Sequence, residues 1–342
     1  MRTIAFLYNI RHHYPDPKDP RTLKEADFDD PETTKLQIKY LKKIGFKVIP
    51  IEANEKSYLK LYRLKKKIDL VFNVSEGMHG EDREAQIPAM LEMLKIPYTG
   101  SPPLAQALML NKAKTKEMLM QNKIPTLPFI LMDSKTQIDK IKLKFPLMVK
   151  PVSEGSSAGI TNKSVVYNVE NLKSQVRFIE KTFQEKSLIE HYLSGREFSV
   201  GMVGNPPRIL PILESDHSLL PKKYLPVDSL EVKWFFEIES KGHDHLKIPA
   251  KISSSLKRKI EKIAFDLWQV IGIRDWCRID IRCDEKENPY VLEVNSPPGI
   301  TPPEHDPACY IVRMAQSSGM KYDDLLLEII RSSAKRYVIK LK

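Results

Sequence analysis

The chain has 342 residues, 42% of them hydrophobic, which is enough for two or three domains with ordinary cores. Its 55 Lys and Arg exceed its 44 Asp and Glu, but they are scattered over helical segments without interleaved aromatic residues, which favours solvated helix faces over a nucleic-acid surface. No apolar run reaches about 18 residues and polar side chains break the N-terminal run, so we expect a cytoplasmic protein without a signal peptide, membrane partner or nucleic-acid partner.

The first part of the chain alternates between two hydrophobic patterns. Short apolar runs and amphipathic runs predict strands at 3–9, 46–52 and 68–74 and helices at 30–45 and 84–96. Asp30 followed by Pro31 is typical of a helix start, because Asp accepts hydrogen bonds from free backbone N–H groups and Pro has none to donate. Strands and helices in alternation predict a parallel α/β sheet with both faces covered.

A loop rich in small residues follows an apolar strand in the middle of the chain. A helix and a strand are predicted within 111–132, and the next strand, at 145–151, carries Lys150 near its end. The loop EGSSAGI at 154–160 comes directly afterwards, and its small side chains let backbone N–H groups approach phosphate oxygens. The loop lacks the spacing of a P-loop, so a plain hairpin turn stays open as an alternative.

Two glutamates interrupt the apolar strands predicted within 188–203. Glu190 and Glu197 lie on either side of a Ser-Gly turn. Because buried glutamates are uncommon, each of them needs a partner. A structural salt bridge would explain either residue, and a nucleotide that offers hydroxyl and amino donors would explain both.

The segment 278–295 places four polar side chains among apolar ones. Its two alternating halves are joined by a polar turn, which predicts a hairpin. In that hairpin Asp280 lies opposite Glu293 and Arg278 lies opposite Asn295, all on one face. Such a face can be solvated, but a solvated face usually mixes Lys, Thr, Ser and Glu, whereas carboxylate and amide oxygens are ligands that Mg²⁺ prefers. The hairpin therefore predicts a metal site beside a bound nucleotide.

These motifs, in this order, resemble the ATP-grasp enzymes of the D-alanine:D-alanine ligase type over nearly the whole chain. The segments that carry the resemblance are VFNVSEGMHGEDREAQIPAMLEMLKIPYTGS (71–101), NKAKTK (111–116), FPLMVKPVSEGSSAGI (145–160), LIEHYLSGREF (188–198), RIDIRC (278–283) and VLEVNSPPG (291–299). The resemblance implies an α/β ATP-grasp fold with three domains, which we expect at 1–103 (parallel α/β), 104–186 (central) and 187–342 (C-terminal). ATP is then expected between the last two.

The resemblance assigns ATP to a set of side chains and backbone groups. Two lysines are expected at the phosphates, the small-residue loop above them, one glutamate at the adenine and another at the ribose hydroxyls. In chain order the implied ATP-binding residues are Lys112, Lys150, Glu154, Gly155, Ser156, Ser157, Glu190, His191, Leu193 and Glu197.

The hairpin matches the metal and catalytic residues of the resembled family. Asp280, Glu293 and Asn295 are expected to hold two Mg²⁺ ions, for which Mn²⁺ can substitute, with Glu293 between the ions. The catalytic residues that the match implies are Arg278, Ser156 and Lys233.

The predicted reaction joins a carboxylate to an amine. A carboxylate is a poor acyl donor, so ATP first converts it to an acyl phosphate, and an amine then displaces phosphate to form an amide. The substrates are expected to be small and amino-acid-like, and homodimers are common in the resembled family. Two alternatives stay open: a genuine D-alanine:D-alanine ligase of cell-wall synthesis, and an ATP-binding protein without ligase turnover.

The chain departs from the family pattern where the substrates are expected. A long loop at 10–30 replaces a Gly-Gly turn, Glu76 replaces a histidine, and Lys233 is followed by Trp rather than Tyr. The stretch 214–247 matches the family poorly as a whole. These departures concern the substrates more than the chemistry.

The acceptor subsite carries the sharpest of these departures. Substrate contacts are expected at Glu76, Gly299 and Glu304, with backbone N–H groups near Gly299 stabilising the oxyanion. The serine that holds the acceptor carboxylate in the resembled ligases falls, by spacing, on Glu304. Because two carboxylates would repel each other there, we predict that free D-alanine is not the preferred acceptor.

Overall fold

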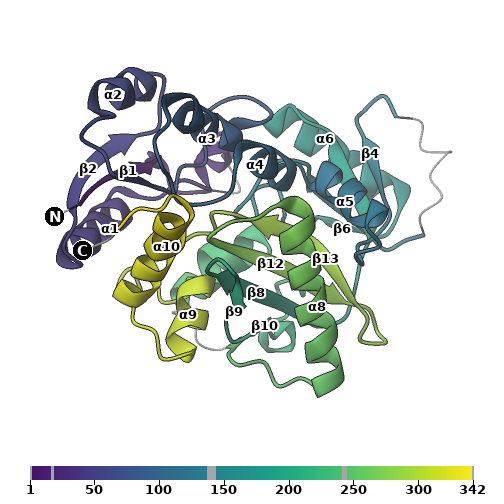
Figure 1. Ribbon diagram of the computed structural model, residues 1–342. Coiled ribbons are helices and arrows are strands. Elements are labelled where there is room, and N and C mark those ends of the chain that lie inside the picture. Colours follow the sequence, from purple (N-terminus) through teal and green to yellow (C-terminus); the bar gives the residue numbers. More distant parts are fainter. Residues whose placement is uncertain (1, 17–18, 137–143, 241–244, 341–342) are drawn as a thin grey trace.

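The computed structural model describes residues 2–16, 19–136, 144–240 and 245–340. Within these residues the strands form three sheets (Figure 1). Residues 17–18 of the loop at 10–30, and residues 241–244 of the stretch at 214–247, lie outside the described residues. No helix in the described ranges is long and apolar enough to span a membrane.

The first sheet is parallel, as predicted, with the strand order β2 (Lys47–Glu52), β1 (Thr3–Tyr8) and β3 (Leu70–Asn73). The helical elements of this part are η1 (Pro20–Glu25), α1 (Pro31–Lys43), α2 (Ser57–Leu64), α3 (Arg83–Leu94) and α4 (Pro103–Leu110). Asp30 caps α1 by accepting hydrogen bonds from two backbone N–H groups, and Pro31 is the first helical residue, as the sequence predicts.

The central sheet is antiparallel, with the strand order β4 (Phe129–Met132), β7 (Ser187–His191), β5 (Leu147–Pro151) and β6 (Val165–Val166). Its helices are α5 (Lys112–Gln121) and α6 (Val169–Phe183). Because β7 pairs with both β4 and β5, this sheet continues past residue 186, where the central domain is expected to end, as far as His191.

The third sheet has the order β11 (Leu246–Lys247), β10 (Leu213–Ser215), β8 (Glu197–Val203), β12 (Trp276–Cys283) and β13 (Pro289–Asn295), and β9 (Arg208–Ile209) pairs with β8. The remaining helical elements are η3 (His217–Leu219), η4 (Val232–Phe236), α7 (Glu237–Glu239), α8 (Ser254–Ile271), α9 (Tyr310–Ser317) and α10 (Tyr322–Arg336). The β12–β13 hairpin has the predicted register, with Asp280 opposite Glu293 and Arg278 opposite Asn295.

The C-terminal helices α9 and α10 share a buried core with the first sheet. Phe6 and Phe72 of that sheet share one buried core with Leu325 and Ile329 of α10. The Arg2 guanidinium donates to the Lys340 carbonyl at 2.9 and 3.1 Å, so the two ends of the described chain meet (Figure 1). This shared core fixes the first sheet relative to the third one, to which the hairpin belongs.

Candidate active site

An ion pair occupies the centre of the polar face of the β12–β13 hairpin. The Arg278 guanidinium donates to both carboxylate oxygens of Asp280, at 2.8–3.1 Å. Ser199 of β8 and Asn295 donate to the same carboxylate at 2.6 and 3.3 Å. Burial alone would lower the pKa of Arg278, but Asp280 raises it above its ordinary value, so the guanidinium keeps its charge.

Glu293 lies opposite Asp280 and close to lysines. Asn111 caps α5 and thereby places Lys112 in the first turn, where Lys112 Nζ lies 3.5 Å from Glu293 Oε2. Burial alone would raise the pKa of Glu293, but Lys112 and then Lys150 lower it to about 2. Glu293 is therefore ionised at any ordinary pH.

Glu190 sits between two lysines in the central part. Its carboxylate lies 2.7 Å from Lys116 Nζ and 2.7 Å from Lys150 Nζ, and all three side chains are almost fully buried. Burial raises the pKa of Glu190, but the two lysines outweigh that effect and lower it. The salt-bridge explanation for Glu190 is thus realised, with Lys116 as a partner that the sequence analysis did not single out.

Glu197 also has a cationic partner. Arg282 of β12 donates to its carboxylate at 2.8 Å and to the Pro226 carbonyl at 2.6 Å. Both side chains line a small cavity of about 70 Å³, whose wall combines apolar side chains with charged ones. Such a mixture suits a flat heterocycle with a polar ribose. Other residues of its wall are Leu127, Met148, Lys150, Ser157, Ile160, Glu190, His191, Leu193 and Val227.

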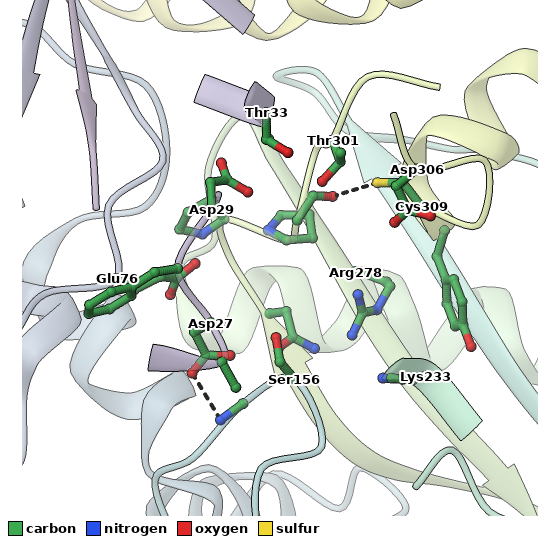
Figure 2. A pocket seen from close by; sticks show the side chains of 18 of the residues that line it. Asp27, Asp29, Thr33, Glu76, Ser156, Lys233, Arg278, Thr301, Asp306 and Cys309 are labelled. Carbon is green, nitrogen blue, oxygen red and sulfur yellow. Dashed lines mark hydrogen bonds between the residues drawn. The ribbon is translucent and has the colours of Figure 1, made fainter. Parts of the chain in front are cut away.

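A larger cavity of about 710 Å³ adjoins the small one, and Lys233 and Glu293 line both. Figure 2 shows Ser156, Lys233 and Arg278 among the side chains that line this larger cavity. Of the predicted catalytic residues, Lys233 lies where the two cavities meet, and Ser156 and Arg278 line the larger cavity. Lys112, Glu154 and Gly155 also contribute to the wall.

Four carboxylates, Asp27, Asp29, Glu76 and Glu84, form one side of the larger cavity, which we call the acidic wall (Figure 2 labels the first three). Burial raises the pKa of Asp29 to about 6 and that of Glu84 to about 8, and it raises that of Glu76 well above its ordinary range. The nearby Arg83 pairs with Asp27 at 3.6 Å. Glu76 and Glu84 form no hydrogen bond or ion pair through their side chains with the residues that the structure describes.

The small-residue loop after β5 is held in an uncommon conformation. Ser156 and Ser157 have left-handed φ angles of 44° and 60°. The Gly155 N–H donates to Asp27 at 3.2 Å, and a Cβ on Gly155 would collide with the Asp27 carboxylate, so a larger residue would displace that part of the acidic wall. Glu154 lies 3.5 Å from the Arg83 guanidinium, and burial raises its pKa to about 7.

Two loops and the short helical element η4 meet at one edge of the larger cavity. The Trp234 indole donates to the Ser156 carbonyl at 3.1 Å, and the Tyr14 hydroxyl donates to the Trp234 carbonyl at 2.8 Å. The Arg11 guanidinium lies over the Trp234 ring, 4.6 Å from its centroid. These residues, Arg11, Tyr14, Ser156 and Trp234, form what we call the Trp234 contact, and they tie the long N-terminal loop to the small-residue loop.

The predicted acceptor residues line another part of the larger cavity. The Gly299 carbonyl accepts a hydrogen bond from Cys309 Sγ at 3.2 Å, drawn as a dashed line in Figure 2. Glu304 is exposed and lines the larger cavity, and its carboxylate contributes, after burial, to raising the pKa of Tyr40 to about 12. The neighbouring His305 lies 2.9 Å from Asp30, so Glu304 has no cation of its own among these contacts.

The expected metal ligands are oxygen donors on adjacent strands. No group of three or more His, Cys, Asp or Glu side chains within the described ranges is placed to hold a metal ion. Asp280, Glu293 and Asn295 instead offer two carboxylates and an amide on one face, with Glu293 ionised. This donor set fits Mg²⁺, which takes few protein oxygens and completes its shell with water and phosphate oxygens.

Several residues of the site carry no signal that sequence reasoning could use. Asp27 and Asp29 belong to a loop without a motif, and Glu84 belongs to the start of α3. Tyr310 opens α9 as one apolar residue among several. Only the folded chain brings these residues to one cavity.

Comparisons with known proteins agree on one family. The family model described as D-ala D-ala ligase C-terminus matches residues 118–331. An uncharacterized protein, y4sG, of Sinorhizobium fredii is 33% identical over 78% of this chain and 75% of its own length. A D-alanine–D-alanine ligase of Nitrosococcus oceani is 30% identical over 78% of this chain and 77% of its own length. A solved D-alanine–D-alanine ligase of Bacillus anthracis, complexed with ATP, is 24% identical with a TM-score of 0.71 over 98% of both chains.

The three sheets, with Lys150 of the central sheet close to Glu293 of the hairpin, define the fold class as ATP-grasp. The family model matches more than half of the chain, which identifies the family within that class. The chain belongs to the D-alanine–D-alanine ligase family. It is an ATP-dependent carboxylate-amine ligase that acts on small molecules and forms a carbon–nitrogen bond, as predicted.

Proposed function

We propose that the enzyme activates the carboxylate of one amino-acid-like substrate as an acyl phosphate and transfers the acyl group to the amine of a second. The observation that carries this proposal is that Lys233 and Glu293 line both the small cavity and the large one, and that Arg278 lines the large one. ATP in the small cavity then points its terminal phosphate at a carboxylate in the large one. ADP, phosphate and an amide are the products.

The phosphoryl transfer needs charge compensation from several directions. Lys112 and Lys150 supply positive charge beside Glu293, and the small-residue loop contributes Glu154, Gly155 and Ser156 to the same cavity. Mg²⁺ held by Asp280, Glu293 and Asn295 would offset the charge of the triphosphate.

Amide formation follows from the same geometry. The amine attacks the acyl carbon, and the negative charge that develops on the acyl oxygen is met by the Arg278 guanidinium and by backbone N–H groups near Gly299. Arg278 is held rigidly by Asp280, so it needs no rearrangement at that moment. Ser156 and Lys233 complete the set around the reacting carboxyl group.

The acidic wall favours a positively charged group on the substrate bound beside it. Glu76 and Glu84 have raised pKa values because they are buried near other carboxylates, and a cation placed between them would lower those values again. The α-ammonium group of an amino acid, or a second basic group on its side chain, has this chemistry. The chain as a whole carries a net charge of +11, so the negative cavity is a local feature.

Glu304 bears on the choice of acceptor. An exposed carboxylate at the rim repels the carboxylate of a free amino acid that approaches it, which supports our prediction that free D-alanine is not the preferred acceptor. A genuine D-alanine:D-alanine ligase of cell-wall synthesis is the competing possibility.

The test is magnesium-dependent release of ADP with a panel of D- and L-amino acids, singly and in pairs. We expect turnover with acyl donors that carry a free ammonium group, and at least about tenfold less turnover with their N-acetyl forms, because an amide cannot form the charged contact. Turnover of about 1 s⁻¹ with D-alanine alone would instead identify a cell-wall dipeptide ligase.

Two variants separate catalysis from simple nucleotide binding. Glu293→Gln keeps the side-chain volume but removes the charge, so ADP release should fall at least about a hundredfold while the chain still folds. Glu285→Gln, in the exposed turn of the same hairpin, is the matched control. Equal activity of Glu293→Gln and the parent enzyme would contradict the site. A homodimer, expected from the resemblance, can be tested by sedimentation velocity.

A further inference from the structure

Tyr310, the first residue of α9, occupies a position that the proposed chemistry does not yet use. Its side chain is 6% exposed and it lines the larger cavity. Lys233 Nζ and the Arg278 guanidinium carbon each lie 5.5 Å from the centroid of this ring. One aromatic ring therefore contacts the two cations placed around the reacting carboxyl group.

The ring faces two groups of like charge. A lysine and an arginine brought to one cavity repel each other, and an aromatic ring within about 6 Å attracts both through the negative potential of its face. Arg278 has a second anchor in Asp280. Lys233 has no ion pair with a carboxylate within 4 Å among the described residues, and the Tyr310 ring is a fixed contact of its ammonium group.

The hydroxyl of Tyr310 is tied to both ends of the segment that carries Lys233. It lies 3.0 Å from Asp228 Oδ2 and 2.8 Å from Glu237 Oε1, which belong to residues before and after Lys233 in the chain. A phenol has one hydrogen, so it donates to one carboxyl group and accepts from the other.

The pKa values of the two carboxyl groups indicate which one accepts. Burial raises the pKa of Asp228, but His217, 2.8 Å away, outweighs that effect and lowers it. Burial raises the pKa of Glu237, in spite of the neighbouring His245. Donation from the Tyr310 hydroxyl to Asp228, and from the Glu237 carboxyl group, when it carries a proton, to the Tyr310 oxygen, would satisfy all three groups.

We propose that Tyr310 is a positioning residue that holds Lys233 and Arg278 in register for the ligase reaction, the ring fixing the cations and the hydroxyl fixing the segment 228–237. The proposal rests on the proposed function, since it assumes that both cations meet the reacting carboxyl group. It predicts an effect on the chemical step rather than on ATP binding, because Tyr310 lines the large cavity and not the small one.

Steady-state kinetics of Tyr310→Leu and Tyr310→Phe test the proposal. Loss of the ring in Tyr310→Leu should lower kcat by about tenfold or more, with KM for ATP within about threefold of the parent value. Tyr310→Phe keeps the ring and loses only the hydroxyl, so it should recover a large part of kcat. Equal kcat of Tyr310→Leu and the parent would overturn the proposal, and so would equal loss in the two variants.

Tyr98 offers a matched control elsewhere in the chain. It is 1% exposed, its hydroxyl donates to Glu92 at 2.9 Å, and the Arg336 guanidinium lies 5.6 Å from its ring centroid, but it lines neither cavity. Tyr98→Leu removes the same kinds of contact and should lower the thermal stability without changing kcat of the folded enzyme. A similar loss of kcat in Tyr98→Leu would show that Tyr310 acts only through stability.

A readout without turnover separates this proposal from the proposed function. The chain has three tryptophans, and Trp268 and Trp276 are buried, so acrylamide quenching reports mainly on Trp234, next to Lys233. Tyr310→Leu should raise the quenching constant by about twofold or more, because the segment 228–237 loses its anchor, and Tyr98→Leu should not. If the parent releases no ADP with any substrate pair, the proposed function fails, while increased quenching still shows that Tyr310 anchors the segment 228–237. Unchanged quenching would overturn that role.

Discussion

Lys150 has two partners at once, which makes its replacement informative. It is buried against Glu190, and it helps to lower the pKa of Glu293 in the hairpin. Lys150→Met removes a positive charge from the expected phosphate site, so it should raise KM for ATP at least about tenfold, which corresponds to about 1.4 kcal/mol of binding. Titration with ADP in a calorimeter should show a loss of affinity in the same direction.

Lys116 supplies the control for Lys150, because it is the other lysine of the same buried group. Either replacement leaves Glu190 with one cation, so both variants should lose stability, by about 3–5 kcal/mol at most. Lys116 lines neither cavity, so Lys116→Met should leave KM for ATP within about threefold of the parent. Equal effects of the two variants on KM would contradict a phosphate role for Lys150.

Glu84 makes the stability of the fold depend on pH. Burial raises its pKa from an ordinary 4.5 to about 8, so the folded chain binds this proton more tightly than the unfolded chain. The stabilising contribution is therefore fully present below about pH 4.5 and is lost as the pH rises toward 8. Glu84→Gln, which resembles the protonated side chain, should lie within about 1 kcal/mol of the parent at pH 5 and be more stable by about 4 kcal/mol at pH 8.

Urea unfolding at the two pH values measures this difference. Glu81→Gln, at an exposed position just before α3, is the control and should follow the parent at both. A parallel loss of stability with pH in the parent and in Glu84→Gln would show that Glu84 is not the group responsible.

At the scale of the elements, the turn that leads into α3 shapes the acidic wall. Gly77 has a φ of +75°, and a Cβ there would collide with the backbone carbonyl of Arg83. Gly77→Ala must therefore move the start of α3, which carries Glu84. We expect a loss of about 2–4 kcal/mol of stability and at least about a tenfold higher KM for the acyl donor.

Gly45→Ala is a control that separates the effect of backbone strain from the effect of moving the start of α3. It also has a positive φ, of +108°, but a Cβ there would meet nothing within 4 Å. Gly45→Ala should lower the stability by only about 1–2 kcal/mol, through backbone strain, and leave KM unchanged. If Gly77→Ala behaved like Gly45→Ala in both measurements, the turn would have no part in substrate binding.

Sequence reasoning predicts elements best where the pattern is local. The strands of the first sheet, the cap at Asp30 and the register of the hairpin follow from alternation and capping, which act over a few residues. The pairing of β7 with β4 and β5 joins segments far apart in the chain, and no local pattern predicts it.

The residues of the site likewise fall into those that a local sequence pattern predicts and those that it does not. Asp280 and Glu293 face each other in a hairpin, so a short pattern brings them together. Glu84 and Asp29 reach one cavity only through the packing of separate elements, and nothing near either residue in the sequence indicates this. The partners of Glu190 and Glu197 cannot be chosen from the sequence, because a salt bridge and a nucleotide require the same acidic side chain.

At the scale of the whole molecule, the Trp234 contact bears on how the products leave. Trp234 donates a hydrogen bond to the Ser156 carbonyl, and Tyr14 donates one to the Trp234 carbonyl. If nucleotide lies under the small-residue loop as we propose, that loop lifts away only when Trp234 is released. Departure of ADP and departure of the amide then become one event instead of two independent exits.

Tyr14→Phe should speed the release of the products. Loss of one hydrogen bond is expected to speed the dissociation of ADP by about fivefold, measured by stopped-flow chase, with the chemical step unchanged. Tyr62→Phe, an exposed tyrosine on α2, is the control, and an unchanged dissociation rate in Tyr14→Phe would mean that the loops part independently. When the loops move together, the contacts of the long N-terminal segment determine the rate of product release. Product release then limits the turnover rate, because it is the slow step in an enzyme whose chemical step is fast.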